Sequence, residues 1–156
     1  MILRWDRRAG VSCALVALGL TAATMVPGCD TGARGVDACR AIESARCDAA
    51  PACEGDDDDF GIATDVQVEN CKVFYNDHCL NGIENNKDSD PDQGDTDDCV
   101  EAVNTTAACQ RSGVASMADC DGVTMETGSE TITPCQALHE PELMSACAFV
   151  ALPPED

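Results

Sequence analysis

Residues 64–82 read TDVQVENCKVFYNDHCLNG and give the strongest helix signal in the chain. Thr64 and Gln67 have the spacing of a capping box, in which the start of a helix and its third residue satisfy each other's backbone groups. Apolar and ring-bearing side chains then recur every three or four residues, which predicts the buried face of a helix. The members of that face are Cys71, Phe74, Tyr75, His78 and Cys79. Asn81 and Gly82 supply a stop signal.

Two cysteines with the same spacing occur earlier in the chain. Cys39 and Cys47 lie on a second predicted helix, residues 38–47, and are eight residues apart, as are Cys71 and Cys79. Eight residues of helix span about 12 Å at about 1.5 Å per residue, which is beyond the roughly 7 Å limit for a disulfide. The equal spacing therefore predicts two bridges between antiparallel helices, Cys39 to Cys79 and Cys47 to Cys71.

Helix signals also follow in the second half of the chain. Asp97 or Asp98 is expected to cap a helix from Cys99 to about residue 111. Thr133 and Pro134 then open a short helix, because proline is favoured at the first helical position.

The last helix is predicted to begin at Pro141. Its apolar residues fall in helical register at Leu143, Met144, Cys147, Val150 and Ala151. Residues 123–133 predict either a short β-hairpin or a loop. The expected fold is therefore a small, mainly α, disulfide-rich domain of four or five short helices.

Ten cysteines follow Cys29, and the remaining six allow several pairings. The separation of these cysteines favours Cys99 with Cys147 and Cys109 with Cys135, which leaves Cys53 with Cys120. The sequence contains no C-x-x-C, so zinc-ribbon, thioredoxin-like and c-type haem signatures are missing and structural disulfides are expected.

Disulfides are expected to carry much of the stability. Aromatic residues make up only 3% of the chain, so little large apolar surface is available for a core. A native disulfide contributes about 2 to 4 kcal/mol, and a folded domain keeps only about 5 to 15 kcal/mol of net stability. Reduction is therefore expected to unfold the protein.

The first 28 residues have the features of an export signal. Arg4, Arg7 and Arg8 precede an uncharged, largely apolar run over residues 9–26. The run ends in Val26-Pro27-Gly28-Cys29, which resembles the lipobox of bacterial lipoproteins. The resemblance implies cleavage before Cys29, lipidation of its sulfur and a protein held on a membrane in the cell envelope, facing the periplasm or the exterior.

This resemblance sets the expected organisation of the chain. Residues 1–28 are the signal peptide, 29–36 the lipidated cysteine and a flexible tether, and 37–152 one helical domain, with Asp37 capping its first helix, before a tail at 153–156. Two other interpretations stay open. Cleavage after Ala22 or Ala23 leaves an odd number of cysteines, eleven, and an uncleaved leader is a membrane anchor.

The chain is strongly acidic, with a formal net charge of −20. Such a charge repels nucleic acid and anionic lipid headgroups, so neither is an expected partner. The expected contacts are a membrane through the lipid anchor and an unidentified protein or glycan in the envelope. Acidic loops are predicted at 54–60 and 85–98.

The second acidic loop is the candidate metal site. Its alternating carboxylates suit calcium, and the candidate ligands are Asp88, Asp90, Asp92, Asp95 and Asp97. The opening Asp-x-Asp-x-Asp is similar to an EF-hand loop, but Gly94 stands at position seven instead of six and Cys99 at position twelve instead of glutamate. The alternative is a solvated acidic loop, and calcium is the one cofactor considered.

No catalytic motif is present. The chain has two histidines, His78 and His139, and Ser129 lacks the G-x-S-x-G frame of a nucleophile elbow. We therefore expect a cell-envelope lipoprotein with a structural or binding role and no enzymatic activity. The alternatives are a small extracytoplasmic hydrolase that uses acidic residues, and a secreted inhibitor or toxin-like module with its loop at residues 120–135.

Overall fold

The protein is mainly helical in the part that the computed structural model describes, residues 34–56, 58–83, 90–126 and 131–151. All of these residues belong to the second of two units, residues 31–156. The α-helices are α1 (Val36–Ala49), α2 (Asp65–His78), α3 (Gln93–Arg111) and α4 (Pro134–His139). The 3-10 helices are η1 (Ala50–Cys53), η2 (Cys79–Asn81), η3 (Met117–Asp119), η4 (Pro141–Leu143) and η5 (Ser145–Val150). Within the described ranges, no helix is both long enough and apolar enough to cross a membrane.

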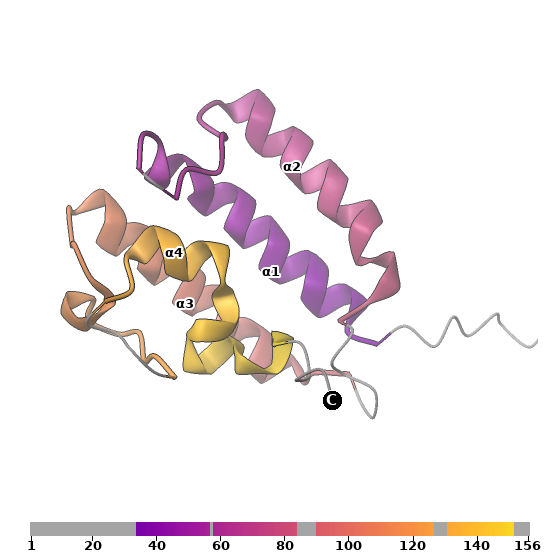
Figure 1. Ribbon diagram of the computed structural model, residues 1–156. Helices are drawn as coiled ribbons and strands as arrows, with labels where there is room; N and C mark the ends of the chain where they lie inside the picture. The colour runs from indigo at the N-terminus through magenta and orange to yellow at the C-terminus, as the bar shows by residue number, and fades with distance from the viewer. Residues whose placement is uncertain (1–33, 57, 84–89, 127–130, 152–156) are drawn as a thin grey trace, which may run out of the picture. The chain divides into compact units, whose positions relative to one another are not determined.

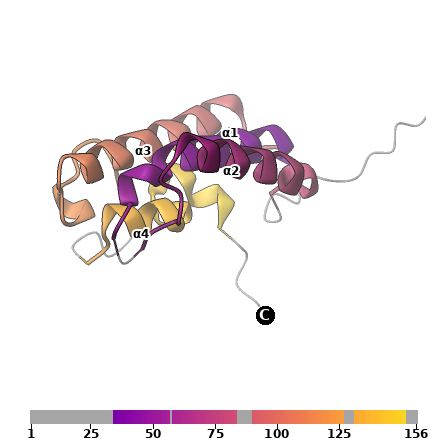
Figure 2. The ribbon, with the colours of Figure 1, turned by 90° about the horizontal axis from the view of Figure 1, so that it is seen from above.

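Helix α1 is the central element of this unit. It packs against α2 on one side and α3 on the other (Figure 1). The C-terminal segment, α4 to η5, forms a second layer that packs mainly on α3, as the view from above shows (Figure 2). The unit is therefore mainly α, as the sequence predicts.

Side chains cap the helices where the sequence predicts caps for α2 and α4. The Thr64 hydroxyl accepts from the Gln67 backbone N–H at 3.3 Å, and the Gln67 side chain accepts from the Thr64 N–H at 3.0 Å. Thr133 caps α4 by accepting from the Gln136 N–H at 3.0 Å, with Pro134 at the first helical position. These polar contacts satisfy backbone N–H groups that have no partner inside the helix.

Helix α1 begins earlier than predicted, and Asp37 does not cap it. Gly35 occupies the cap position with a φ of 67°, and its N–H donates to the Asp90 carboxylate. The backbone of Arg34 also accepts from the Ile83 N–H at 2.7 Å. The end of the expected tether is therefore part of the folded unit.

Helix α3 also begins earlier than predicted, inside the acidic segment. Asp92 caps it by accepting from the Asp95 N–H at 2.8 Å, so Asp97 and Asp98 lie within the helix. A carboxylate at the cap and another in the first turn interact favourably with the positive end of the helix dipole. The acidic residues thus extend the helix that Cys99 was expected to begin.

The C-terminal segment is not the continuous helix that its apolar register predicts. Met144 is extended, with φ −83° and ψ 130°, and separates η4 from η5. It forms an isolated antiparallel bridge with Met125, and the Ser145 N–H donates to the Thr124 carbonyl at 2.8 Å. This pairing interrupts the helix. Residues 123–133 are predicted to form either a hairpin or a loop, and those that the structure describes, 123–126 and 131–133, form no strand.

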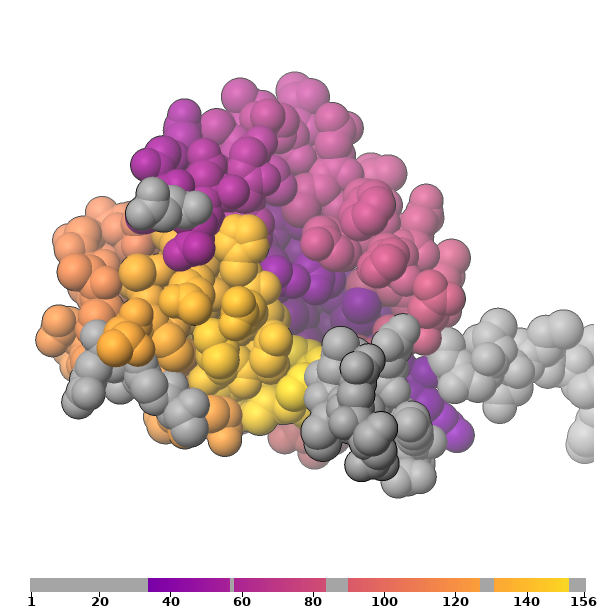
Figure 3. Space-filling view, viewed as in Figure 1, coloured from indigo at the N-terminus to yellow at the C-terminus, as the bar shows by residue number. Residues whose placement is uncertain are grey.

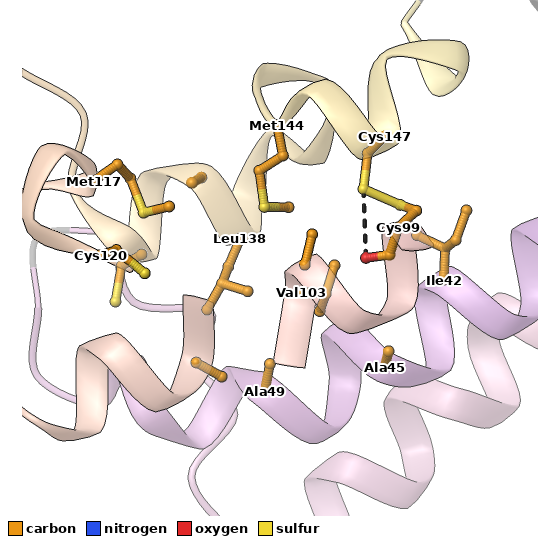
Figure 4. Close-up of a cluster of buried hydrophobic side chains, with 14 of the residues drawn as sticks. Ile42, Ala45, Ala49, Cys99, Val103, Met117, Cys120, Leu138, Met144 and Cys147 are labelled. Carbon is orange, nitrogen blue, oxygen red and sulfur yellow. Dashed lines mark hydrogen bonds between the residues drawn. A yellow bond between two sulfur atoms is a disulfide. The ribbon is translucent and has the colours of Figure 1, made fainter. Parts of the chain in front are cut away.

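Aliphatic side chains, methionines and cystines fill the core between α1, α3 and the C-terminal layer. Figure 4 shows Leu138 and Met144 of the C-terminal layer pointing toward α3, which carries Val103, while Ile42 of α1 lies near Cys99. Each of these five side chains is at most 1% exposed. The Thr106 hydroxyl, also buried, donates to the Ala102 carbonyl at 2.8 Å, so the core holds no unpaired polar group there.

Five disulfides cross-link the unit. Three expected pairs are present: Cys39 with Cys79, Cys47 with Cys71, and Cys99 with Cys147. The other two expected pairs are wrong, because the structure joins Cys53 with Cys135 and Cys109 with Cys120. A turn at Gly113, with φ 80°, reverses the chain after α3 and returns Cys120 to Cys109. Cys53 therefore pairs with Cys135 at the start of α4.

Candidate binding groove

The structure gives the predicted calcium ligands separate structural roles. Asp88 lies outside the described residues. Asp90 accepts from the Gly35 backbone N–H, and Asp92 accepts from the Asp95 N–H. Asp95 and Asp97 are two positions apart on α3 and therefore point in different directions. Among the described residues, no group of three or more His, Cys, Asp or Glu side chains is placed to hold a metal ion.

The first acidic segment is likewise tied into the fold where it is described. Asp57 lies outside the described residues. Asp58 accepts from the Thr133 hydroxyl at 3.3 Å, and Asp59 accepts from the Gly61 N–H at 2.7 Å. These carboxylates fix the connection between η1 and α2. Cys29, the predicted lipidation site, lies outside the described residues.

A groove runs along the face of α1 that neither α2 nor the C-terminal layer covers. Figure 3 views this face, in which indigo atoms of α1 lie in a hollow between α2 and the yellow C-terminal segment. Two cavities make up this α1 groove, and Glu43 lines both of them. We call them the ring cavity and the aliphatic cavity.

The ring cavity has a volume of about 270 Å³. Its walls include Phe60 and Ile62 from the connection before α2, Tyr75 from α2 and His139 from α4, while Asp59 stands at its edge. The Phe60 and His139 rings stack with centroids 3.8 Å apart. His139 Nε2 also lies 2.9 Å from the Asp58 carbonyl oxygen, so this ring is held in place from two sides.

The aliphatic cavity has a volume of about 280 Å³ and continues the groove toward the other end of α1. Its apolar walls are Ile42 of α1, Ile83 after η2, and Pro141 and Val150 of the C-terminal segment. His78 and Glu43 supply its polar groups. One half of the groove thus has rings and carboxylates, and the other half is mostly aliphatic.

Arg46 lines the ring cavity, but four of its five N–H donors are already used. Its Nε donates to the Leu138 carbonyl at 2.8 Å, and its Nη2 donates to the His139 carbonyl at 2.7 Å. Its Nη1 pairs with both carboxylate oxygens of Glu43, at 2.7 and 2.9 Å. Arg46 therefore holds the end of α4 against α1, and it has little capacity left to bind an anion.

Two other basic residues near this part of α1 and α2 are also engaged. Arg40 Nε donates to the Asn76 carbonyl at 3.2 Å. Lys72 Nζ lies 2.7 Å from an Asp48 oxygen and 3.6 Å from a Glu69 oxygen. The hydrogen bond to the Asp48 carboxylate raises the pKa of Lys72 above its ordinary value. This pair joins α2 to α1 beside the Cys47–Cys71 bridge.

Ring-bearing residues gather along the groove from distant parts of the sequence. Phe60, Tyr75 and His139 line the ring cavity, His78 lines the aliphatic cavity, and Phe74 stacks on His78 with centroids 5.5 Å apart. The sequence predicts Phe74 and His78 on the buried face of α2, and both are exposed instead. Val68 is the buried apolar residue of α2 that the predicted face omits.

A larger hollow, of about 520 Å³, lies between the first turn of α1 and the start of α3. It is lined by Asp37, Asp90, Pro91 and other short side chains, and no ring-bearing residue contributes to it. Asp90 already accepts from the Gly35 N–H. The α1 groove is therefore the better candidate for a specific site, although this larger hollow exceeds either of its cavities.

No known protein family matches this chain, and no curated protein or solved structure is similar to it.

Proposed function

We propose that this chain is an exported lipoprotein, anchored through Cys29, whose helical domain binds a ligand in the α1 groove. The observation that carries the binding role is the gathering of Phe60, Tyr75, His78 and His139 over one face of α1. Ring-bearing side chains in a concave site, with a few placed polar groups, are typical of ligand-binding sites. The ten cysteines paired in the described residues support an oxidising compartment outside the cytoplasm.

A binding role accounts for these side chains better than hydrolysis does. The His139 ring is stacked on Phe60 and held at the Asp58 carbonyl, and His78 is stacked on Phe74. A general base needs to reach the proton that it removes, and a nucleophile needs such a base beside it. Neither histidine has a serine, threonine or free cysteine as a hydrogen-bond partner in the described residues.

Photo-crosslinking in intact cells tests the binding role. A photoreactive phenylalanine analogue replaces Tyr75 in the groove, and in a control protein it replaces Val73, which is 65% exposed on the outer face of α2. We expect the Tyr75 position to give one defined adduct by mass spectrometry and the Val73 position to give none. Equal labelling from both positions, or no adduct from Tyr75, would contradict the proposal.

Intact mass tests the anchor and the oxidation state together. The mature protein is expected to begin at Cys29, to carry the mass of a lipid, and to show ten alkylatable thiols only after reduction. An unmodified Cys29 thiol would contradict the lipoprotein assignment but would not bear on the proposed binding role of the groove.

Calcium binding by the acidic segments stays a separate prediction, supported by the density of carboxylates near Asp90 and Asp92. If calcium binds the folded state, the melting temperature rises with calcium concentration, because a ligand of the native state stabilises it. The test is a thermal melt in calcium and in chelator. An unchanged midpoint of thermal unfolding would contradict calcium binding by the folded protein.

A further inference from the structure

We propose that the α1 groove binds an extended segment of a partner protein in which a lysine or arginine is followed, two residues later, by an aliphatic side chain. This inference rests on the binding role proposed above and names the ligand that the groove selects. Three properties of the groove carry it: its free charge, the division between its two cavities, and the distance between them.

The charge available in the ring cavity is negative. Arg46 is neutralised by Glu43 and donates to two backbone carbonyls, so it does not offset the charge of Asp59. The Asp59 carboxylate lines the cavity and accepts from the Gly55 and Gly61 backbone N–H groups, which leave its negative charge in place. Tyr75 and Phe60 line the same cavity, and aromatic rings attract ammonium and guanidinium groups. A carboxylate together with rings favours a basic side chain over an acidic or neutral one.

The aliphatic cavity favours a different side chain. Ile42, Ile83, Pro141 and Val150 supply apolar walls, and burial of an aliphatic group against them is favourable. The two cavities, 270 and 280 Å³, are each smaller than the roughly 300 to 1,000 Å³ typical of small-molecule sites. Each cavity therefore suits one side chain of a longer ligand.

The separation between the cavities matches an extended chain. The α1 residues of the ring cavity are Glu43, Arg46 and Cys47, and those of the aliphatic cavity are Cys39, Ile42 and Glu43. Their centres are about four residues apart, or about 6 Å along the helix. Side chains on one face of a strand recur every two residues, at about 6.6 Å. A basic residue and an aliphatic residue with one residue between them therefore reach both cavities.

The charge of the whole protein favours a basic protein segment as the source of these side chains. With a net charge of −20, the chain attracts basic segments over a distance and repels nucleic acid and anionic lipid. Free polyamines are also basic, but they have no aliphatic side chain to fill the aliphatic cavity.

Fluorescence anisotropy with labelled serine-rich octapeptides tests the proposal on the mature protein with its disulfides intact. The probe carries Lys-Ser-Leu at its centre. The comparison peptides carry Glu-Ser-Leu, Lys-Ser-Ser, and Lys-Ser-Ser-Ser-Leu, which has helical spacing. We expect the probe to bind at least about tenfold more tightly than each of them, a difference of about 1.4 kcal/mol.

Substitutions in each cavity test which side chain of the peptide that cavity binds. Asp59→Asn is expected to weaken binding of the Lys-Ser-Leu probe by about three- to fivefold at low salt, as for an exposed charge pair. Asp119→Asn on η3 is the matched control and is expected to leave binding unchanged. Val150→Ser is expected to weaken Lys-Ser-Leu and to leave Lys-Ser-Ser unchanged, with Val73→Ser as its control. Near-ultraviolet circular dichroism confirms that each variant is folded.

The outcomes separate this inference from the binding role. Equal binding of the probe and Glu-Ser-Leu, tighter binding of the helical-spacing peptide, or binding of soluble cell-wall glycan fragments in place of the probe would overturn the ligand class. If a Tyr75 adduct still forms in cells, the binding role survives such a result. If no adduct forms either, both proposals fail.

Discussion

Helices α2 and α4 are held against the rest of the protein in different ways. Helix α2 has fourteen residues, of which Val68 is the one buried residue, and two disulfides join it to α1. Helix α4 has six residues, of which four are buried. The longer helix is attached mainly by covalent bonds, whereas the shorter one combines a single disulfide, Cys53–Cys135, with extensive burial. The length of a helix is therefore a poor guide to how firmly packing holds it.

This difference bears on the groove, because α2 and the C-terminal layer form its two walls. The apolar side chains Val66, Val73 and Phe74 of α2 are 60 to 70% exposed, so they contribute little burial. The Cys47–Cys71 bridge instead fixes α2 at its middle, and the Cys39–Cys79 bridge fixes it just past its C-terminal end. One wall is thus placed mainly by disulfides, and the other by core packing together with the Cys53–Cys135 and Cys99–Cys147 bridges.

A substitution in the core is expected to have the largest effect. Leu138→Ala removes a fully buried side chain of α4, at 0% exposure, and is expected to lower the free energy of unfolding by about 2 to 5 kcal/mol. Leu80→Ala, in η2 directly after α2, is expected to change it by less than about 0.5 kcal/mol. Denaturant titration of the oxidised proteins measures both. If both variants lost similar amounts of unfolding free energy, core burial would not distinguish the two walls of the groove.

Removal of the helix caps is expected to have an intermediate effect. Thr64→Ala and Thr133→Ala each leave a backbone N–H at a helix start without its partner, at a cost of about 0.5 to 2 kcal/mol. We expect Thr133→Ala to lower global stability, because α4 belongs to the core. Thr64→Ala should mainly increase amide exchange within residues 65–70. A uniform rise in exchange along the chain in Thr64→Ala would show that α2 unfolds together with the core.

The smallest expected effect is a pH dependence of the attachment of α2. The hydrogen bond to Asp48 raises the pKa of Lys72 above its ordinary value of 10.5, so the charged form of Lys72 is favoured in the folded state. Its stabilisation is present in full below the pKa of the unfolded chain and is lost as the pH rises through the folded pKa. An exposed pair of this kind contributes less than about 1 kcal/mol.

The measurement compares wild type with Lys72→Met between about pH 9 and pH 11.5. The difference in the free energy of unfolding between wild type and the variant should shrink as the pH rises across that interval. A constant difference in the free energy of unfolding would show that the pair with Asp48 contributes nothing measurable.

Local signals in the sequence predict the parts of this fold that local interactions determine. The Thr64 capping box and the Thr133 cap depend on neighbouring residues, and both are present. The equal spacing of cysteines on two helices likewise identifies the Cys39–Cys79 and Cys47–Cys71 bridges.

Features that depend on contacts between distant residues were not predictable in this way. The apolar register after Pro141 is consistent with a helix, but the pairing of Met144 with Met125 interrupts it. Asp92 caps α3 although acidic residues after it resemble a loop. The groove requires Phe60 and His139 to meet across 79 positions of the sequence, and no spacing rule anticipates that stack.

The most direct test of this account is amide exchange after removal of both bridges between α1 and α2. The variant replaces Cys39, Cys47, Cys71 and Cys79 with alanine and keeps the other three disulfides. The account predicts that exchange in residues 65–78 rises by several orders of magnitude, since each bridge contributes about 2 to 4 kcal/mol, while residues 93–111 keep their protection. If α2 kept its protection, or if α2 and α3 lost theirs together, the claim that disulfides place this wall of the groove would be contradicted.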